Sequence, residues 1–435
     1  MKPNTHALTG FMELLPQQQQ EFDRILAIIS DEYQRYGFTP LDTPIIERTE
    51  TLLAKAGGET EKQIYRFTKG DNDLSLRFDL TVPLARYIAE HRSELVFPFR
   101  RSHIGKVFRG ERAQHGRFRE FFQCDIDVIG ENNLSINYDA ELPRVIFAIF
   151  KRLDFGDFLI KVNNRKILTG MMEQFGLAGQ TQVIMRLIDK AEKISREDLI
   201  SELKDLGIEQ EKVDSLLNFI AISGMPADVI KSLRNLNFTN ETFLVGVSEL
   251  ETVTNMMAAM DINDSNYGVD LAIARGLDYY TGTVYETYLK EYPSLGSICS
   301  GGRYDNLTSY YTNEQYPGVG VSIGLTRLFD QLTELGLVSA GRKTTADVLV
   351  IPYSGNELGN ALKIADQLRG AGVNTDILLE NYPLKKSFRY ADKLGVKHVI
   401  VVGSEEIKTG NYTLQDMTSG VKQNAPIDEI IRTLS

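Results

Sequence analysis

The stretch Phe121-Phe-Gln-Cys-Asp-Ile-Asp-Val-Ile129 alternates between two kinds of side chain. Successive side chains of a β-strand point to opposite faces, so this pattern predicts a strand with two different faces. The apolar face carries Phe122, Cys124, Ile126 and Val128. The opposite face carries Phe121, Gln123, Asp125 and Asp127, which is more hydrogen-bonding chemistry than contact with solvent requires.

A second segment, Leu76-Arg-Phe-Asp-Leu-Thr-Val82, repeats the pattern and places Arg77, Asp79 and Thr81 on one face. Either strand alone suits an antiparallel sheet with one solvated face. Two strands that both present such groups also suit the floor of a pocket. That pocket would hold a small ligand with an ammonium group and several hydrogen-bonding groups.

A basic run lies between these two segments. Residues 97 to 123 contain seven Lys or Arg and two Glu, in a chain whose formal net charge is −11. Such a run is usually a solvated face, but guanidinium groups beside a hairpin also bind phosphate oxygens. We therefore expect an anion site for a nucleoside triphosphate. The sequence has no GxxxxGK[ST] motif, which excludes a P-loop as that site.

The composition is that of a globular protein with two or three domains, because 435 residues are too many for one core. The two cysteines, Cys124 and Cys299, lie in no metal-binding motif. No apolar run is long enough to cross a bilayer, and residues 1 to 9 lack the apolar core of a secretory signal. We expect a cytoplasmic protein.

The pattern of the chain changes several times along its length. We expect a helix over 17–36, strands over 75–130, a charged helical insertion over 161–260, and further strands over 267–325. A linker at 341–345 precedes a unit over 346–435 that alternates strand and helix, typical of an α/β module with a largely parallel sheet.

Together these segments resemble class II aminoacyl-tRNA synthetases, and specifically the histidyl-tRNA synthetase family. Pro44 and its neighbours resemble class motif 1, residues 108–121 motif 2, and residues 318–328 motif 3. Two further segments, Arg275-Gly-Leu-Asp-Tyr-Tyr280 and Gly301-Gly-Arg-Tyr-Asp305, are similar to motifs of the histidine enzyme. Ala113 departs from the proline that is common in the motif 2 loop.

The resemblance implies a fold and a set of partners. The catalytic domain, residues 1–160 and 261–335, would be an α+β domain on a mostly antiparallel sheet, with the helical insertion at 161–260. The unit at 346–435 would be the α/β anticodon-binding domain. Implied partners are histidine, tRNA(His), ATP, Mg²⁺ and a second copy of the chain, because motif 1 lies at a dimer interface. No membrane is implied.

The resemblance also implies a role for each residue that matches a histidine-binding position. Asp79, Thr81 and Gln123 would bind the ammonium group of histidine. Asp127 and Tyr280 would flank the imidazole ring. Tyr279 and Tyr304 would line the same pocket.

The ATP site follows in the same way. Arg109 would bind the histidine carboxylate and the α-phosphate, and Arg275 would lie against the α-phosphate, so these two are the implied catalytic residues. Glu111 would meet the adenine amino group, Arg117 the γ-phosphate, and Phe121 and Arg327 the two faces of adenine. No Mg²⁺ ligand is implied. An ionised carboxylate that attacks phosphorus needs positioned cations and no general base.

Two alternatives remain open from the sequence. One is the non-catalytic synthetase-like regulatory subunit of ATP phosphoribosyltransferase, which usually lacks the C-terminal domain and has degraded motifs. The other is a class II synthetase for threonine, proline or glycine. The arginine set argues against the first, and Asp127 with the 275–280 segment argues against the second.

Overall fold

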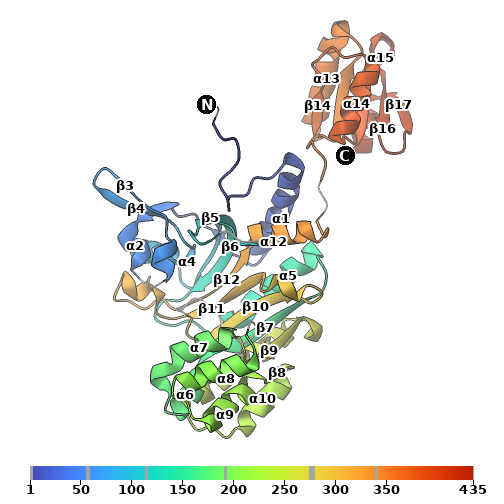
Figure 1. Cartoon of the computed structure of the whole chain (residues 1–435). Coiled ribbons are helices and arrows are strands. Elements are labelled where there is room, and N and C mark those ends of the chain that lie inside the picture. Colours follow the sequence, from blue (N-terminus) through green and yellow to red (C-terminus); the bar gives the residue numbers. More distant parts are fainter. Residues whose placement is uncertain are drawn as a thin grey trace. The chain divides into compact units, whose positions relative to one another are not determined.

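The computed structural model describes residues 3–54, 59–112, 116–190, 194–273, 280–338 and 341–434. These residues form two compact units (Figure 1). The first unit comprises residues 1–12 and 25–337, and the second comprises residues 13–24 and 338–435. Within the described part of the chain, no helix is long and apolar enough to cross a membrane.

A nine-stranded sheet forms the centre of the first unit. Its strands in spatial order are β1 (Thr39–Pro40), β5 (Phe99–Phe108), β6 (Glu120–Ile129), β12 (Gly318–Gly324), β11 (Cys299–Tyr304), β10 (Thr283–Leu289), β7 (Phe158–Asn164), β9 (Tyr267–Asp270) and β8 (Ser223–Gly224). The pairs β1–β5 and β7–β9 are parallel and the other pairs are antiparallel. The sheet is therefore mixed, where the sequence predicts a mostly antiparallel one.

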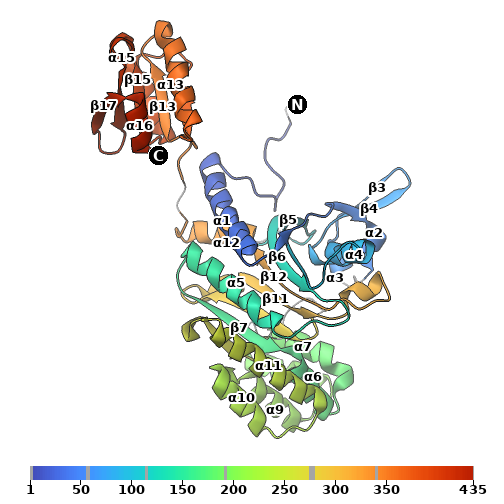
Figure 2. The ribbon, with the colours of Figure 1, turned by 180° about the vertical axis from the view of Figure 1, so that it is seen from behind.

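Helices cover the apolar face of this sheet. They are α1 (Pro16–Arg35), α5 (Tyr138–Leu153) and α12 (Leu325–Glu334), and Figure 2 shows α5 lying across the strands. The predicted helix over 17–36 is present, and Gly37 follows it at φ 74°. Near the end of α1, the Tyr33 hydroxyl donates to the Cys124 carbonyl of β6 at 2.8 Å. This contact fixes the helix against the apolar side of β6 and leaves the polar side free.

A small three-stranded sheet lies beside the main one. It contains β2 (Ile46–Arg48), β4 (Asn72–Leu76) and β3 (Arg66–Lys69), accompanied by the helices α2 (Thr49–Leu53), α3 (Glu59–Gln63) and α4 (Thr81–His91). The prediction of a strand over residues 76–82 is wrong, because the strand ends at Leu76 and α4 begins at Thr81.

The reason lies in Asp79 and in burial. Asp79 Oδ1 accepts hydrogen bonds from the backbone N–H groups of Thr81 and Val82, at 3.1 and 2.9 Å, which satisfies donors of the first helical turn. Pro83 stands in that turn, where its missing N–H is tolerated. Residues 77–81 are all buried and residues 77–80 lie in no strand, so their apolar and polar alternation does not report two strand faces.

A group of helices joins β7 to β9, within the predicted insertion. These helices are α6 (Arg165–Gln174), α7 (Thr181–Lys190), α8 (Arg196–Asp205), α9 (Gln210–Ile220), α10 (Pro226–Asn235) and α11 (Glu241–Ala259). Helices α6 and α11 cross closely at Gly170, where an added Cβ would lie 2.2 Å from the backbone nitrogen of Phe243. Short 3₁₀ turns lie at Ala178–Gln180, Asp264–Asn266, Pro293–Leu295, Leu307–Tyr310 and Gly355–Glu357.

The second unit has its own five-stranded sheet, in the order β14 (Thr375–Ile377), β13 (Val348–Pro352), β15 (His398–Val402), β16 (Asn411–Asp416) and β17 (Lys422–Pro426). The first three strands are parallel, as predicted, and β16 and β17 are antiparallel. Its helices are α13 (Leu358–Gly370), α14 (Leu384–Leu394), α15 (Ser404–Thr409) and α16 (Ile427–Leu434).

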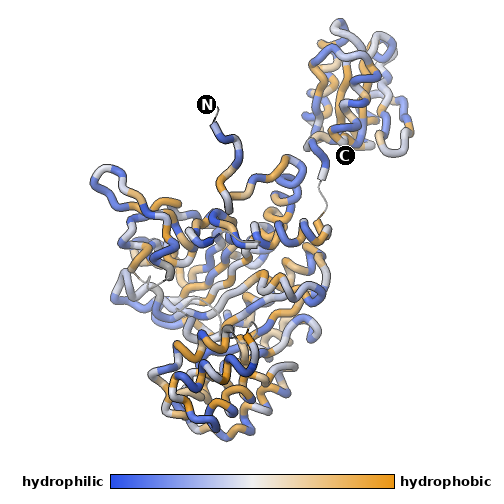
Figure 3. Tube along the Cα trace, in the orientation of Figure 1, coloured by the Kyte–Doolittle hydropathy of each residue, from blue (hydrophilic) through white to orange (hydrophobic). Residues whose placement is uncertain are grey.

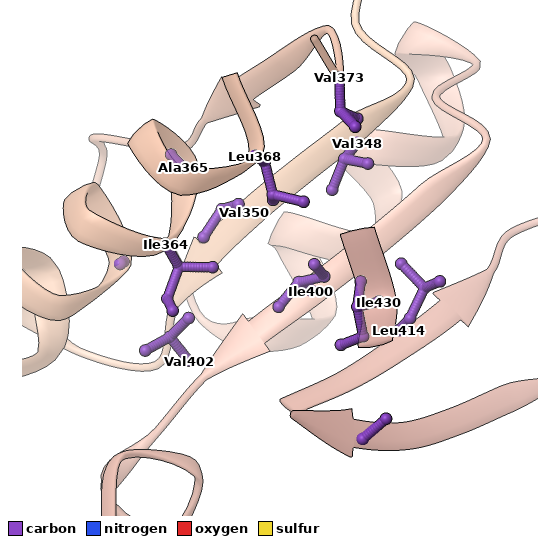
Figure 4. Close-up of a cluster of buried hydrophobic side chains, with 12 residues drawn as sticks. Val348, Val350, Ile364, Ala365, Leu368, Val373, Ile400, Val402, Leu414 and Ile430 are labelled. Atoms are coloured by element: carbon purple, nitrogen blue, oxygen red, sulfur yellow. The ribbon is translucent and has the colours of Figure 1, made fainter. Parts of the chain in front are cut away.

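Apolar residues of the second unit concentrate along its strands (Figure 3). Figure 4 shows Val350 and Ile400 of neighbouring strands facing Ile364 and Leu368 of α13, with Ile430 of α16 closing the cluster. Burial of such side chains is worth about 1.5–3 kcal/mol each. This unit therefore has a hydrophobic core of its own.

Candidate active site

A polar cavity of about 460 Å³ lies in the first unit. Its lining comes from β6, β11, β12, the start of α4 and the connection between β5 and β6. The residues of the predicted histidine and ATP sites that line it are Asp79, Thr81, Arg109, Glu111, Arg117, Phe121, Gln123, Asp127, Tyr280, Tyr304 and Arg327. Arg275 and Tyr279, also predicted, lie outside the described residues.

Strand register explains why the polar groups of β6 meet in this cavity. Asp127 pairs with Arg101 of β5 and Gly320 of β12, and Asp125 pairs with His103 and Ser322. Directly opposed residues share one face of a sheet, so both rows face the same side. At Gly320 an added Cβ would lie 2.0 Å from Asp127 Oδ1. The glycine therefore leaves the space that the aspartate occupies.

Asp127 is held by two donors. The Arg101 Nη2 donates to Asp127 Oδ2 at 2.7 Å, and the Tyr304 hydroxyl donates to Asp127 Oδ1 at 2.5 Å. Arg101 is fully buried. Burial raises the pKa of Asp127, while Arg101 and the Tyr304 hydroxyl oppose that rise. A buried carboxylate of this kind needs its partners, because an unpaired buried charge is costly.

Asp125 and Gln123 belong to a second hydrogen-bonded group on the same face. Gln123 Nε2 donates to Ser322 Oγ at 2.9 Å, and the Ser322 hydroxyl bonds the Asp125 carboxyl. Burial raises the pKa of Asp125 to about 7; Arg101 opposes this rise and Asp127 adds to it. Asp125 lines the cavity, although the sequence motifs give it no role.

Arg77 lies away from the cavity lining, where it and His103 are buried and both contact the exposed Asp42. Its Nη1 donates to Asp42 Oδ1 at 3.1 Å, and His103 Nε2 is 2.8 Å from the same oxygen. Burial and the neighbouring Arg101 lower the pKa of His103 to about 3, so this ring is neutral at physiological pH. The expectation that Arg77 shares a ligand-facing side with Asp79 is therefore wrong.

The arginines of the cavity are placed to meet anions. The Arg109 guanidinium lies over the Phe78 ring at 4.4 Å and the Phe121 ring at 5.1 Å, contacts that orient its planar fork. Arg117 Nη1 donates to Glu111 Oε2 at 3.3 Å. Arg327 Nη2 donates to the Leu295 carbonyl at 2.5 Å.

Only part of the basic run of residues 97–123 lines the cavity. Arg109 and Arg117 line the cavity, whereas Arg100 forms a bidentate pair with Glu141 and Lys106 pairs with Glu120. Arg101 is used to hold Asp127. A count of charges along the chain does not distinguish these uses, because they depend on the face from which each side chain projects.

Sequence reasoning missed Arg101 and Ser322 as parts of the site, and it placed Asp125 on the polar face of the strand without a role of its own. The sequence does contain a pattern that indicates Arg101, because Arg101 alternates with His103 and Gly105 on one face of β5. Aligning that face with the polar face of β6 would have found the pair. The register itself is not visible in either strand alone.

The floor and the rim of the cavity together suit a zwitterionic amino acid beside a polyanion. Carboxyl and amide oxygens would accept hydrogen bonds from an ammonium group, and arginines would bind a carboxylate and phosphates.

Comparison with known proteins agrees with this kind of ligand. The family described as histidyl-tRNA synthetase matches residues 10–328, and the anticodon binding domain matches residues 347–435. A "Histidine--tRNA ligase" of Clostridium tetani is 52% identical, with 98% of this chain and 97% of the relative covered. One of Finegoldia magna is 45% identical, with both chains covered completely.

A solved structure shares the whole fold. The crystal structure of histidyl-tRNA synthetase from Nostoc sp. PCC 7120 superposes with a TM-score of 0.92 at 41% identity, covering 99% of this chain and 100% of that one. A large mixed sheet with a separate anticodon-binding domain is the fold of class II aminoacyl-tRNA synthetases. Within that class, the chain belongs to the histidyl-tRNA synthetase family.

Proposed function

We infer that the chain is a histidine–tRNA ligase, which activates histidine with ATP and transfers it to tRNA(His), and that the polar cavity is its active site. Family membership supports the reaction. The assignment of the site rests on one observation. A single cavity of suitable size for a small ligand is lined by Asp79, Gln123, Asp127 and Arg109.

The floor of the cavity would bind histidine. Gln123, Asp79 and Thr81 are assigned to the ammonium group, and Asp127, Tyr280 and Tyr304 to the imidazole end. Tyr279 belongs to the same wall by its motif. A pocket that hydrogen-bonds both ring nitrogens rejects analogues that leave its buried groups unpaired.

The rim would bind ATP. Arg109 is assigned to the histidine carboxylate and the α-phosphate, and Arg117 to the γ-phosphate. Glu111 is assigned to the adenine amino group, with Phe121 and Arg327 on the adenine faces. Arg275, with Arg109, is the second catalytic arginine in this proposal.

The chemistry needs charge stabilisation more than proton transfer. The histidine carboxylate attacks the α-phosphorus, the bond to the β-phosphate oxygen breaks, and pyrophosphate leaves. A ribose hydroxyl at the 3′ end of the tRNA then attacks the carbonyl carbon, and AMP leaves. Arg109 would bring the two anions together and stabilise the charge on the phosphoryl oxygens.

Mg²⁺ would serve as a further cation that neutralises the phosphates. Within the described ranges, no cluster of three His, Cys, Asp or Glu side chains could form a dedicated metal cage. This fits Mg²⁺ bound mainly by ATP and water, since Mg²⁺ keeps several waters and uses one or two carboxylates.

The chain would comprise two domains and one insertion. Residues 1–160 and 261–335 would form the catalytic domain, 161–260 the insertion, and 346–435 the anticodon-binding domain. We also propose a homodimer, supported by the exposed Ile45 and Ile46 beside Pro44 in the motif 1-like segment. We also propose that the enzyme acts in the cytoplasm, where it would meet its tRNA substrate.

Histidine-dependent exchange between ATP and pyrophosphate tests the enzyme and its amino acid together. We expect exchange with histidine and Mg²⁺ and none with threonine, proline or glycine. A folded sample without histidine-dependent exchange would contradict the proposal. Sedimentation at micromolar concentration tests the dimer, which predicts twice the mass of one chain.

A further inference from the structure

Two acceptor oxygens on the cavity floor are left over when the hydrogen bonds of β6 are assigned. The Gln123 amide donates to Ser322 at 2.9 Å, and the Ser322 hydroxyl bonds Asp125. Among the residues that the structure describes, Gln123 Oε1 and Asp125 Oδ1 then have no hydrogen-bond partner. Both residues line the cavity, and Asp125 is only 3% exposed.

Asp127, the neighbouring carboxylate, is in a different situation. One of its oxygens accepts from Arg101 at 2.7 Å and the other from Tyr304 at 2.5 Å. An unmet buried acceptor is unfavourable, so a ligand donor stabilises the complex more at Asp125 than at Asp127.

The two unmet acceptors are joined through Ser322 and therefore belong to one place on the floor. An ammonium group has three N–H donors and can reach several acceptors at once, whereas each ring nitrogen offers at most one. Two adjacent acceptors beside the position assigned to the ammonium group thus favour the amine end of the ligand over its ring.

The charges around Asp125 favour a cation as well. It faces Arg101 and His103 of β5, Asp127 of its own strand and Asp79 before α4, with Tyr33 of α1 and Cys299 of β11 nearby. His103 is neutral at physiological pH because burial lowers its pKa to about 3. Arg101 acts on all three carboxyl groups and is bound to Asp127, and Arg109 acts in addition on Asp79.

We propose that Asp125 is a substrate-binding residue of the amino-acid pocket, whose Oδ1 accepts a hydrogen bond from the α-ammonium group of the substrate, next to Gln123 Oε1. This inference rests on the proposed function and extends it to a residue that the family motifs do not assign. The bound ammonium group supplies a positive charge beside the carboxyl groups and holds Asp125 in its ionised form.

Two inhibitors that differ in the ammonium group test the assignment. Histamine carries the imidazole ring and the ammonium group, and 4-ethylimidazole carries the ring alone. Inhibition constants against histidine-dependent exchange are measured for wild type and Asp125→Asn. Loss of a charge-assisted hydrogen bond in the variant should raise the inhibition constant of histamine by roughly 10- to 100-fold. The inhibition constant of 4-ethylimidazole should stay within about twofold of its wild-type value.

Asp127→Asn is the matched control, with the same change two residues along the same face. Because Asp127 is assigned to the ring, this variant should raise the inhibition constants of both inhibitors by a similar factor. Equal weakening of both inhibitors by Asp125→Asn would assign Asp125 to the ring and overturn the proposal, as would no weakening of either. Failure of wild type to exchange with histidine would instead refute the proposed function.

A wild-type complex provides a test that does not depend on the variant folding. In a crystal structure with histidine bound, the ammonium nitrogen should lie within about 3.2 Å of Asp125 Oδ1. A direct contact of Asp125 with a ring nitrogen, or a separation too long for any hydrogen bond, would overturn the proposal.

Discussion

At the scale of single residues, the ionisable groups below the cavity have opposite effects on stability. Burial raises the pKa of Asp125 to about 7, so its folded form holds a proton that the unfolded chain releases near pH 4. Burial lowers the pKa of His103 to about 3, so its folded form lacks a proton that the unfolded chain binds below about 6.5. As pH rises from about 4 to 6.5, the contribution of Asp125 to the free energy of unfolding falls and that of His103 rises.

Asp125→Asn should reveal this balance. The stabilising contribution of the Asp125 proton is present below the unfolded pKa and is lost as pH rises through the folded pKa. The variant lacks that contribution, so its unfolding free energy should rise relative to wild type from about pH 4 to 7, by at most about 1.4 kcal/mol per pH unit. Urea unfolding at a series of pH values measures the difference. A difference that does not vary with pH would mean that Asp125 is ionised in the folded free protein.

Arg101 should act as a positioning residue for Asp127. Arg101→Met leaves Asp127 buried without its charged partner, which typically costs about 3–5 kcal/mol in unfolding free energy. Without Arg101 the pKa of Asp127 should rise further, so KM for histidine should rise and should partly recover as the pH increases. Urea unfolding and exchange kinetics measure both effects. Arg101→Lys keeps the charge, so its unfolding free energy and its KM for histidine should change less.

Arg100→Met is the control for that variant. Arg100 is the adjacent residue but pairs with Glu141 in a partly exposed position, where an ion pair is worth about 1 kcal/mol or less. Its KM for histidine should be unchanged at every pH. If Arg101→Met lost stability but kept a normal KM across the pH range, Arg101 would be structural alone.

At the scale of secondary-structure elements, period two predicted β6 correctly and residues 76–82 wrongly. Strand β6 pairs on both sides, packs its apolar face on helices and turns its polar face to the cavity. Residues 77–81 are buried on all sides, and helix α4 starts where Asp79 caps the free N–H groups. Both segments are largely buried, and they differ in that β6 pairs with two neighbouring strands. Local alternation does not encode that pairing.

Asp79 should therefore have two separable roles. Asp79→Ala removes the acceptor of the first helical turn, which should cost about 1 kcal/mol of stability, and it should also weaken histidine binding. Asp79→Asn keeps an acceptor oxygen for the helix but loses the charge, so it should remain near wild-type stability and still raise KM for histidine. Urea midpoints and exchange kinetics compare the two. Wild-type KM in a stable Asp79→Asn protein would limit Asp79 to the helix.

At the scale of the whole molecule, the sequence predicted the order of the parts better than their pairing. The helical region, the linker and the α/β unit appear where the patterns change, and the parallel arrangement of β13, β14 and β15 is confirmed. The antiparallel strands β16 and β17 were not predicted. The cavity floor depends on cross-strand register between residues far apart in sequence, such as Asp127 and Gly320, which no local pattern encodes.

Deleting residues 346–435 should separate activation of histidine from its transfer to tRNA. The cavity lies wholly within the first unit, and the deleted unit has its own core around Val350, Ile400 and Leu368. The shortened protein should retain part of the histidine-dependent exchange, because no cavity residue is lost. Charging of tRNA(His) should fall steeply, since single-stranded anticodon bases are read by stacking and edge hydrogen bonds that the deleted unit would supply. Exchange and charging rates on the same preparation measure the two steps. A shortened protein that charged tRNA(His) with normal efficiency would show that recognition does not require this unit, whereas loss of both activities in a folded sample would show that the first unit needs it for catalysis.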